Sequence, residues 1–443
     1  MTKRVGFQSV WFRTTAGIAA FLGMAIAFSA CQRLPSSAHS EVKKTPTALN
    51  LGVLLPATGN LSAVGEPVLQ VLPLITNTIN ACGGVNDAPV NLVVEDEQPD
   101  PKAQTEVVRR LAASQVSAIV GGFVSDAATA AEVTAAVQHK IPLISPSNTS
   151  PIFTEQAKKG NFRGFWGRTI PADTTQAIAL AQLAKSRGFN TVATLVVNDS
   201  NGIRFEQAFA AAFKQLGGTI LNQANPTRYD PQESNFDEVA VAAFNPAGKL
   251  PDAVVADLNP STGSLLLQSA YNQGLVDGVQ LMLKTRVRNS TFTNSAFIEE
   301  VGQAPNGKFL LEGAIGTAPS VESAVNTNFL KLWKQKQNTP PEIYVSQTWD
   351  AIALLTLAAQ AAKSNNGEAI KNKLRQVANA PGVKVTDICE ALQRVRDGQD
   401  IDYQGVSGAV DLNENGDVVS DYDIWTVDTQ GKVRKIGQVK LKP

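Results

Sequence analysis

The sequence predicts an α/β protein with two similar lobes, each built on a parallel sheet, and three observations support this prediction. From residue 49 onward, short β-rich runs alternate with longer amphipathic segments, which is the rhythm of consecutive βαβ units. The rhythm stops at FWGRTI, residues 165–170, and restarts near residue 173. The chain has 443 residues, of which 43% are hydrophobic, so it has enough apolar material for two cores.

The N-terminal segment, residues 1–30, has the pattern of a secretory signal peptide. Basic residues precede an apolar stretch, residues 16–28, which is shorter than the roughly 20 residues of a spanning helix. Small residues then lead to Cys31, and FSAC resembles the bacterial lipobox, in which the cysteine is acylated. We therefore expect a lipid-anchored chain in which residues 31–47 form a flexible tether. Secretion without a lipid is the alternative.

The first lobe is expected to contain four strands with helices between them. The strand segments share aliphatic residues and a polar, Gly or Pro boundary; they are LNLGVLLP (49–56), VNLVVEDE (90–97), SAIVGG (117–122) and PLISP (142–146). The amphipathic segments are residues 66–81, residues 101–114 and a third before the last strand.

The same pattern returns after residue 173 and becomes less regular in the C-terminal third. The expected helices of the second lobe are residues 173–187 and 205–216, and its strands are TVATLVV (191–197), GTILNQ (218–223), DAVVADL (252–258) and VQLMLKT (279–285). The last third has helical segments at residues 321–337, 346–363 and 386–397 and strand segments at residues 421–427 and 431–439. Such a tail can return across both lobes.

Composition and motifs exclude several classes of function. The net charge is zero and no long basic run exists, which argues against a nucleic-acid partner. The sequence lacks the P-loop, dinucleotide-binding, hydrolase-elbow and zinc-protease signatures. Of its two histidines, His39 falls in the tether and His139 near a helix end, so neither is expected to be a catalytic base. We therefore expect no enzyme activity, no cofactor and no metal.

The segment DLNENGD, Asp411–Asp417, begins like a calcium-binding loop. Oxygen-bearing side chains stand at its first, third and fifth places, and Gly416 stands at the sixth. The twelfth place, however, is Tyr422 where a calcium loop has a bidentate Glu. The flanking segments are strand-like, so we expect a hairpin turn around Asn415 and Gly416.

Polar side chains follow two neighbouring strands of the first lobe. Ser125 comes after AIVGGFV and precedes an Ala-rich helix, and Ser147, Asn148 and Thr149 come after LISP. In open parallel sheets, ligands bind beyond the carboxyl ends of the strands, where loops and helix N-termini present hydrogen-bond donors. We expect these side chains to contact a small polar ligand. The alternatives are a helix cap for Ser125 and a solvated turn for residues 147–149.

Several segments resemble the periplasmic leucine/isoleucine/valine-binding protein family of ABC importers, which has the type I periplasmic-binding fold. They are LGVLLPATGNLSAVGEP, INACGGVNDAPVNLVVEDEQPDP, AIVGGF, LISPSNTSPIFT and GSLLLQSAYNQGL. Their order and spacing carry the resemblance over nearly all of residues 48–440. The tail YQGVSGAVDLNENGDVVSDYDIWTV is similar to cyanobacterial members that serve neutral amino acids.

The resemblance implies two Rossmann-like lobes with parallel sheets, joined by a three-segment hinge. One lobe would consist of residues 48–170 and 318–398, and the other of residues 171–317 and 399–443. The three crossings would lie near Gly167–Pro171, Thr317–Ser320 and Gly398–Gln404. The family topology also places Cys82 and Cys389 in the same lobe, where they could form a disulfide or remain two thiols.

The resemblance also implies which residues contact ligand. In the first lobe, Ser125, Ser147 and Thr149 match the groups that hold the ligand α-carboxylate. The matching positions of the second lobe are Asn201, Asn259, Thr285 and Arg286. These depart from the family, which often has a Tyr at the position of Asn201 and an acidic residue near Thr285 to receive the ligand ammonium.

Arg286 leaves two alternatives open. If its side chain enters the cleft, the site suits a ligand with a second acidic group or an uncharged polar ligand. Otherwise Arg286 faces solvent or pairs with Asp257. The ammonium of the ligand is then accepted by Thr285 and main-chain carbonyls.

The function implied by the resemblance is that of a monomeric receptor, anchored in the periplasm by its lipid. It would close on a small polar ligand, an amino acid, and present it to an ABC permease. Two alternatives remain: a ligand-sensing module for a membrane signalling partner, and a receptor for urea or short amides.

Overall fold

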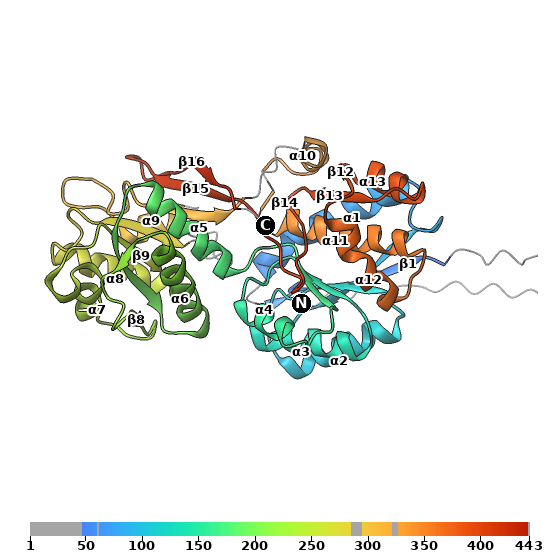
Figure 1. Cartoon of the computed structure of the whole chain (residues 1–443), viewed down its shortest axis with the longest axis horizontal. Coiled ribbons are helices and arrows are strands. Elements are labelled where there is room, and N and C mark those ends of the chain that lie inside the picture. The colour runs from blue at the N-terminus through green and yellow to red at the C-terminus, as the bar shows by residue number, and fades with distance from the viewer. Residues whose placement is uncertain are drawn as a thin grey trace, which may run out of the picture. The chain divides into compact units, whose positions relative to one another are not determined.

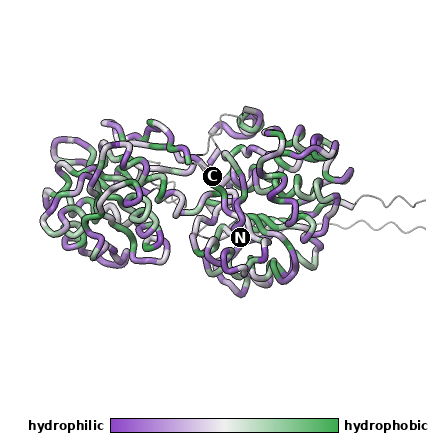
Figure 2. The backbone as a smooth tube through the Cα atoms, in the orientation of Figure 1, coloured by the Kyte–Doolittle hydropathy of each residue, from purple (hydrophilic) through white to green (hydrophobic). Residues whose placement is uncertain are grey.

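The computed structural model describes residues 47–59, 62–284, 295–320, 327–339, 341–342 and 344–441. Within these ranges, helices cover two mainly parallel sheets, and a small third sheet is added (Figure 1). Hydrophobic residues run through the interior of each lobe (Figure 2). None of the helices in these ranges is long and apolar enough to cross a bilayer. The expected signal peptide, Cys31, Thr285 and Arg286 lie outside the described residues.

The first sheet has the strand order β2-β1-β3-β4-β5, and its neighbouring strands are parallel. Its strands are β1 (Leu49–Leu55), β2 (Val90–Asp96), β3 (Ala118–Val120), β4 (Leu143–Ser145) and β5 (Trp166–Arg168). The helices of this lobe are α1 (Ser62–Ala81), α2 (Pro101–Ala113), α3 (Asp126–Gln138), α4 (Pro151–Lys158), α10 (Thr327–Lys334), α11 (Val345–Ala362), α12 (Gly367–Ala378) and α13 (Ile388–Arg396).

Helices bury both faces of this sheet, which is why its strands are apolar on both sides. Leu51 and Val53 of β1 pack with α1 and α11 on one face, whereas Leu54 packs with α2 and α3 on the other. Helix α11 is buried from Val345 to Gln360, as expected for a helix enclosed by neighbouring helices and the sheet.

The second sheet has the order β16-β15-β11-β10-β9-β6-β7, with β8 paired to β6. Its strands are β6 (Thr191–Val197), β7 (Thr219–Ile220), β8 (Thr227–Tyr229), β9 (Ala253–Asp257), β10 (Gln280–Lys284), β11 (Ile315–Pro319), β15 (Tyr422–Val427) and β16 (Val433–Val439). The helices are α5 (Asp173–Ser186), α6 (Ser200–Gln215), α7 (Asp237–Phe244), α8 (Pro260–Asn272) and α9 (Ser295–Val301). Strands β15 and β16 join antiparallel, so the C-terminal tail returns to this lobe, as expected.

The third crossing differs from the sequence expectation. Residues 401–418, which the sequence assigned to the second lobe, belong to the first. The strands of the third sheet are β12 (Val383–Val385), β13 (Ile401–Gly405) and β14 (Gly408–Ala409), and β13 pairs with both of the others. Tyr403 and Val418 are part of the first-lobe core. The chain therefore crosses between Val418 and β15, not near Gly398–Gln404.

A buried carboxylate explains why this segment stays in the first lobe. Asp350 of α11 accepts hydrogen bonds from the N–H groups of Val406 and Ser407, both at 2.8 Å, and from the Ser407 hydroxyl at 2.6 Å. A Cβ on Gly405 would lie 2.5 Å from Asp350 Oδ2, so only glycine allows the approach. These hydrogen bonds thus attach the turn between β13 and β14 to α11.

Cys82 and Cys389 join the two ends of the first lobe's sequence. Cys82 directly follows α1 and Cys389 lies in α13; their Cα atoms are 5.4 Å apart and their sulfur atoms are bonded. A disulfide between residues 307 positions apart closes a long loop, and such bonds typically contribute about 2–4 kcal/mol.

Asp350 should make the stability of the protein pH-dependent. Burial raises the pKa of its carboxyl from 3.8 to about 6, although hydrogen bonds oppose the change. Because the pKa is higher in the folded state, the contribution is present in full below the unfolded value and is lost as pH rises through about 6. The difference corresponds to about 3 kcal/mol. Between pH 4 and pH 8, the unfolding free energy of the parent minus that of Asp350→Asn should fall by this amount in urea unfolding.

The matched control is Asp252→Asn. The N–H groups of Thr191 and Asn190 lower the pKa of Asp252, so that difference should change in the opposite direction. A parent-minus-Asp350→Asn difference that stays constant with pH would contradict the account.

Candidate ligand-binding site

The first-lobe edge of the site consists of two loops at the carboxyl ends of β3 and β4. The Gly122 turn, residues 121–125, connects β3 to α3, and the Ser147 loop, residues 146–150, connects β4 to α4. Because neighbouring parallel strands end at the same edge of a sheet, both loops lie there together. Ser125 is the exposed N-cap of α3, and its Oγ accepts a hydrogen bond from the N–H of Ala128 at 3.4 Å.

Gly122 connects the two loops. Its carbonyl accepts the Ser147 hydroxyl at 2.8 Å and the Ser145 hydroxyl at 3.5 Å. Ser145 Oγ in turn accepts the N–H groups of Ser147 and Asn148 at 3.3 and 3.0 Å. Gly122 has φ +89°, and a Cβ there would lie 2.9 Å from Ser145 Oγ, so another residue would be strained and crowded.

The predicted residues of the Ser147 loop therefore differ in whether their side-chain polar groups are available to a ligand. Ser147 is 3% exposed, and its hydroxyl donates inward to Gly122. Asn148 is fully buried, and its Oδ1 accepts the N–H of Ser150. Thr149 is half-buried, and no hydrogen bond of its hydroxyl occurs within the described residues. Thr149 is thus the member of the loop whose side chain remains available to a ligand.

Arg168, the last residue of β5, holds the Ser147 loop in place through hydrogen bonds to its main chain. Its fully buried guanidinium donates to the carbonyl oxygens of Asn148 and Ser150 at 3.1 and 3.0 Å and to Thr154 Oγ1 at 2.6 Å. Asp417 accepts its Nε at 2.7 Å and forms the ion pair. The sequence analysis missed Arg168. The signal available was a basic residue inside the apolar segment FWGRTI, since a buried charge needs a partner.

The segment Asp411–Asp417 supplies that partner as a turn, as predicted. Asn413 Oδ1 accepts the N–H groups of Asn415 and Asp417 at 2.8 and 3.1 Å. The Gly416 carbonyl accepts the N–H of Arg168 at 2.9 Å. No group of three or more His, Cys, Asp or Glu side chains suited to a metal ion occurs in the described part of the chain.

The second-lobe edge lies at the carboxyl ends of β6, β9 and β10. Asn201 is in the first turn of α6, and its Oδ1 accepts the hydroxyl of Ser150 at 3.1 Å. Asn259 follows β9, and its N–H donates to the hydroxyl of Tyr229 at 2.7 Å. Thr285 and Arg286 follow β10 but lie outside the described residues, so their roles stay predictions.

A buried ion cluster, which the sequence analysis missed, lies at this second edge. Lys284 Nζ is 3.0 Å from Asp173 Oδ2 and 3.3 Å from Asp257 Oδ2. The side chains of these three residues are 2%, 9% and 0% exposed, respectively. Lys284 is thus a cation paired with Asp257. Among the described residues, the cluster brings two carboxylates together with one ammonium.

Asp173 also connects the cluster to the first-lobe edge. It is the first residue of α5, and its N–H donates to the Thr149 carbonyl at 2.8 Å. Burial raises the pKa of Tyr422 well above its usual range, and the negative charge of Asp173 raises it further. The cluster therefore begins directly beside the residue whose hydroxyl is available to a ligand.

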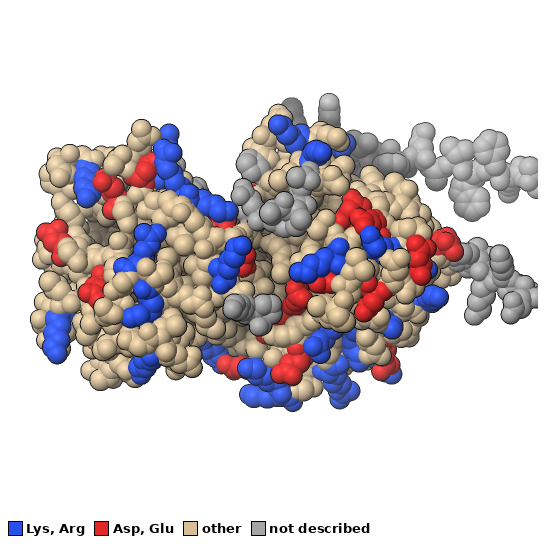
Figure 3. Space-filling view, turned by 45° about the horizontal axis from the view of Figure 1, so that its top comes forward, with Lys and Arg blue, Asp and Glu red and all other residues tan. Residues whose placement is uncertain are grey.

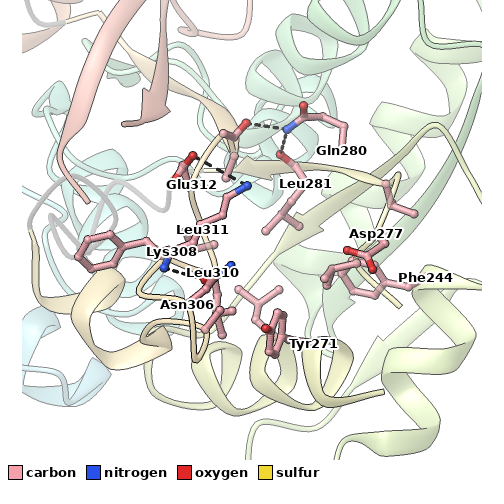
Figure 4. A pocket seen from close by; sticks show the side chains of 17 residues that line it. Phe244, Tyr271, Asp277, Gln280, Leu281, Asn306, Lys308, Leu310, Leu311 and Glu312 are labelled. Atoms are coloured by element: carbon pink, nitrogen blue, oxygen red, sulfur yellow. Dashed lines mark hydrogen bonds and ion pairs between the residues drawn. The ribbon is translucent and has the colours of Figure 1, made fainter. Parts of the chain in front are cut away.

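Two cavities of the described residues lie away from these two edges. One, of about 460 Å³, opens where β10 begins, at the end of the sheet opposite the second-lobe edge. Figure 4 shows Phe244, Tyr271 and Asp277 around it and the hydrogen bonds of Gln280 at its other side. Another, of about 870 Å³, lies between α3 and α4. None of the predicted ligand-contacting residues lines either cavity.

Comparison with known families decides where the chain belongs. The model of the receptor family ligand binding region (ANF_receptor) matches residues 68–430. The chain belongs to this family. One relative is the Leu/Ile/Val-binding protein homolog 1 of Brucella abortus, which is 25% identical over 333 residues. The match covers 74% of this chain and 82% of that protein.

Another relative is the chemotactic signal transduction system substrate-binding protein BasB of Halobacterium salinarum, 25% identical over 403 residues, covering 86% of this chain and 88% of that protein. Among solved structures, the leucine-binding protein LivK of Thermotoga maritima has a TM-score of 0.64 at 21% identity, covering 88% and 99% of the two chains. A solute-binding protein of an R. palustris ABC transporter in complex with benzoate has a TM-score of 0.60 at 18% identity, covering 89% and 96%. These structures confirm the predicted two-lobe α/β fold.

The Arg168 ion pair can be tested by removing its charge partner. Asp417→Asn should lower the unfolding free energy by about 3 kcal/mol or more, because it leaves a buried guanidinium without a counter-charge. Hydrogen exchange of residues 148–154 should accelerate. Glu414→Gln, an exposed change in the same turn, is the control and should alter neither quantity. Equal stability of the two variants would show that Arg168 does not depend on Asp417.

Proposed function

We propose that the protein is an extracytoplasmic solute-binding receptor of an ABC importer that captures an amino acid between its two lobes. The observation that carries this proposal is the opposite character of the two edges. The first presents hydroxyl donors, and the second holds a buried cluster in which two carboxylates lie beside one ammonium. An α-amino acid carries the complementary pair of charges.

The first-lobe edge suits the α-carboxylate. Thr149 offers a hydroxyl, and the exposed Ser125 hydroxyl remains able to donate while its Oγ accepts the N–H of Ala128. Ser147 and Asn148 contribute by fixing the loop, since their polar groups are used within the protein. Hydrogen bonds from such donors to a charged acceptor are each worth about 1.5–3 kcal/mol.

The second-lobe edge suits the ammonium group. Burying an ammonium without an acceptor is costly, and the cluster has the carboxylate oxygens of Asp173 and Asp257 as acceptors. Of the two acidic residues, Asp173 is the one that contacts Thr149, because its N–H donates to the Thr149 carbonyl. Asn201, Asn259, Thr285 and Arg286 would then determine which side chain the ligand carries.

The mechanism follows from the two edges belonging to different lobes. A ligand that contacts both edges is bound most tightly when the lobes close on it, so it shifts the population toward the closed state. The closed receptor would be recognised by the permease. A signal peptide, acylated Cys31 and a tether would keep a monomeric receptor at the membrane in the periplasm. The similarity to a Leu/Ile/Val-binding protein homolog and to a leucine-binding protein supports a receptor and not an enzyme.

A second candidate function is ligand sensing for a membrane signalling partner. The similarity to the chemotactic protein BasB favours it, because that relative covers 86% of this chain. Uptake of labelled amino acid in a strain lacking the gene separates the two. Lost uptake supports transport, and lost behavioural response with normal uptake supports sensing.

The ligand class can be tested by calorimetric titration of residues 46–443. The panel is leucine, alanine, glutamine and glutamate, together with 4-methylpentanoate, 3-methylbutylamine, benzoate and urea. The two leucine analogues each lack one of the charged groups, so each should bind at least about tenfold more weakly than leucine. Analogues that bind as tightly as the amino acid, or binding of benzoate or urea alone, would contradict the proposal.

A further inference from the structure

An ion pair that the ligand contacts described above do not use connects the two lobes. Glu155 belongs to α4 of the first lobe, and Arg204 belongs to α6 of the second. The Arg204 guanidinium donates from Nε to Glu155 Oε1 at 2.7 Å and from Nη2 to Oε2 at 2.9 Å. Two parallel hydrogen bonds between a guanidinium and a carboxylate add orientation as well as energy. The pair therefore forms only when α4 and α6 face each other in a defined arrangement.

The pair lies next to the contact between Ser150 and Asn201. Ser150 is the last residue of the Ser147 loop and the N-cap of α4, and its hydroxyl donates to Asn201 Oδ1 at 3.1 Å. Arg204 comes one turn after Asn201 on α6, so both side chains lie on the same face of that helix. The two contacts together join the start of α4 to the start of α6. The ion pair is thus connected through α4 to the loop that carries Thr149.

Neighbouring charges favour the ionised form of both partners. The hydrogen bonds from Arg204 lower the pKa of Glu155, and the charges of Lys159 and Lys158 lower it further, while burial opposes them. In the same way, the hydrogen bonds to Glu155 raise the pKa of Arg204, and the charge of Asp126 adds to this. Glu155 and Arg204 are therefore both charged near neutral pH.

The exposure of the pair makes it reversible. The side chains of Arg204 and Glu155 are 28% and 45% exposed, respectively, so water reaches both partners. Exposed ion pairs change an equilibrium by no more than about fivefold, because water replaces each partner when the pair separates. A contact of this strength shifts the balance between open and closed lobes without preventing the release of a ligand.

We propose that Arg204 and Glu155 form an interlobe latch, which stabilises the closed receptor and thereby raises its affinity for ligand without contacting the ligand. A ligand held by both lobes binds the closed state best, so its apparent affinity falls with the population of that state. Arg204 and Glu155 are thus positioning residues, which act through the arrangement of α4 and α6. The effect on affinity rests on the proposed function, because it takes the ligand to bind between the lobes.

The interlobe latch predicts a specific dependence on ionic strength. Salt screens the attraction between partly exposed charges, and the screening length falls from about 30 Å at 0.01 M salt to about 3 Å at 1 M. The parent should therefore lose affinity for ligand as salt is raised. A variant without the ion pair should lose less, because its closed state no longer depends on this attraction. A purely structural role of Arg204 would not produce this difference.

The first experiment needs no ligand. In the protein of residues 46–443, Gln138→Cys on α3 and Ala211→Cys on α6 place spin labels at exposed positions of the two lobes. Electron–electron double resonance then gives the distribution of distances between the labels. Arg204→Ala and Glu155→Ala should each lower the population at the distance of the latched arrangement, by up to about fivefold. Identical distributions in the parent and both variants would overturn the proposal.

The second experiment measures affinity at low and high salt with the amino acid that binds the parent most tightly in the titration panel. At low salt, Arg204→Ala and Glu155→Ala should each bind up to about fivefold more weakly than the parent. The double variant should bind no more weakly than either single variant, because both substitutions remove the same interaction. Additive losses, or a parent and variants with parallel salt dependence, would overturn the proposal.

The matched control is an ion pair of the same geometry that lies within one lobe. Arg109 donates to Glu106 from Nε at 2.7 Å and from Nη2 at 2.6 Å, and both residues belong to α2. Arg109→Ala should therefore alter neither the label distances nor the affinity. Changes as large as those of Arg204→Ala would show an effect of surface charge alone and would overturn the proposal.

The two experiments separate failure of this inference from failure of the proposed function. If no amino acid binds the parent, the proposed function fails, and the label distances still decide whether Arg204 and Glu155 hold the lobes together. If an amino acid binds the parent and both variants equally, the proposed function stands and the latch is overturned.

Discussion

The first-lobe edge depends on the buried guanidinium of Arg168. A fully buried cation is tolerated only when it is paired and hydrogen-bonded, and here Asp417, Thr154 and the carbonyls of the Ser147 loop satisfy it. The consequence is that the main chain of residues 148–150 is fixed before any ligand arrives. Such preorganisation lowers the entropic cost of binding. It also explains why residues 411–418 return to the first lobe: their turn supplies the counter-charge.

The two edges of the site use charge differently. At the first, Arg168 is neutralised by Asp417, so uncharged donors remain. At the second, Lys284 lies between the carboxylates of Asp173 and Asp257. On the surface, by contrast, basic and acidic side chains are interspersed over the face seen in Figure 3. The charges described beside the candidate site are buried at the strand ends.

The sequence predicted those features of the fold and site that depend on the local pattern of residues. The β-rich segments located most strands of the two main sheets but not β5, β8 or β11. Polar residues after LISP located the Ser147 loop. It could not show that Ser147 turns inward while Thr149 does not, because both are small hydroxyl residues in one turn. It also missed Arg168, Lys284 and the lobe of residues 401–418. Each of these is determined by a partner distant in the sequence: Asp417 for Arg168, Asp173 for Lys284, and Asp350 for the turn at residue 407.

The central claim is that the fixed Ser147 loop leaves the Thr149 hydroxyl to hold the ligand carboxylate. Calorimetric titration of Thr149→Ala with the amino acid that binds the parent most tightly tests it, with Thr134→Ala as the control, since that exposed hydroxyl donates within α3 to Ala130. Loss of a hydrogen bond to a charged acceptor predicts weakening of about 1.5–3 kcal/mol for Thr149→Ala and none for the control. Unchanged affinity in a folded Thr149→Ala protein would contradict the claim.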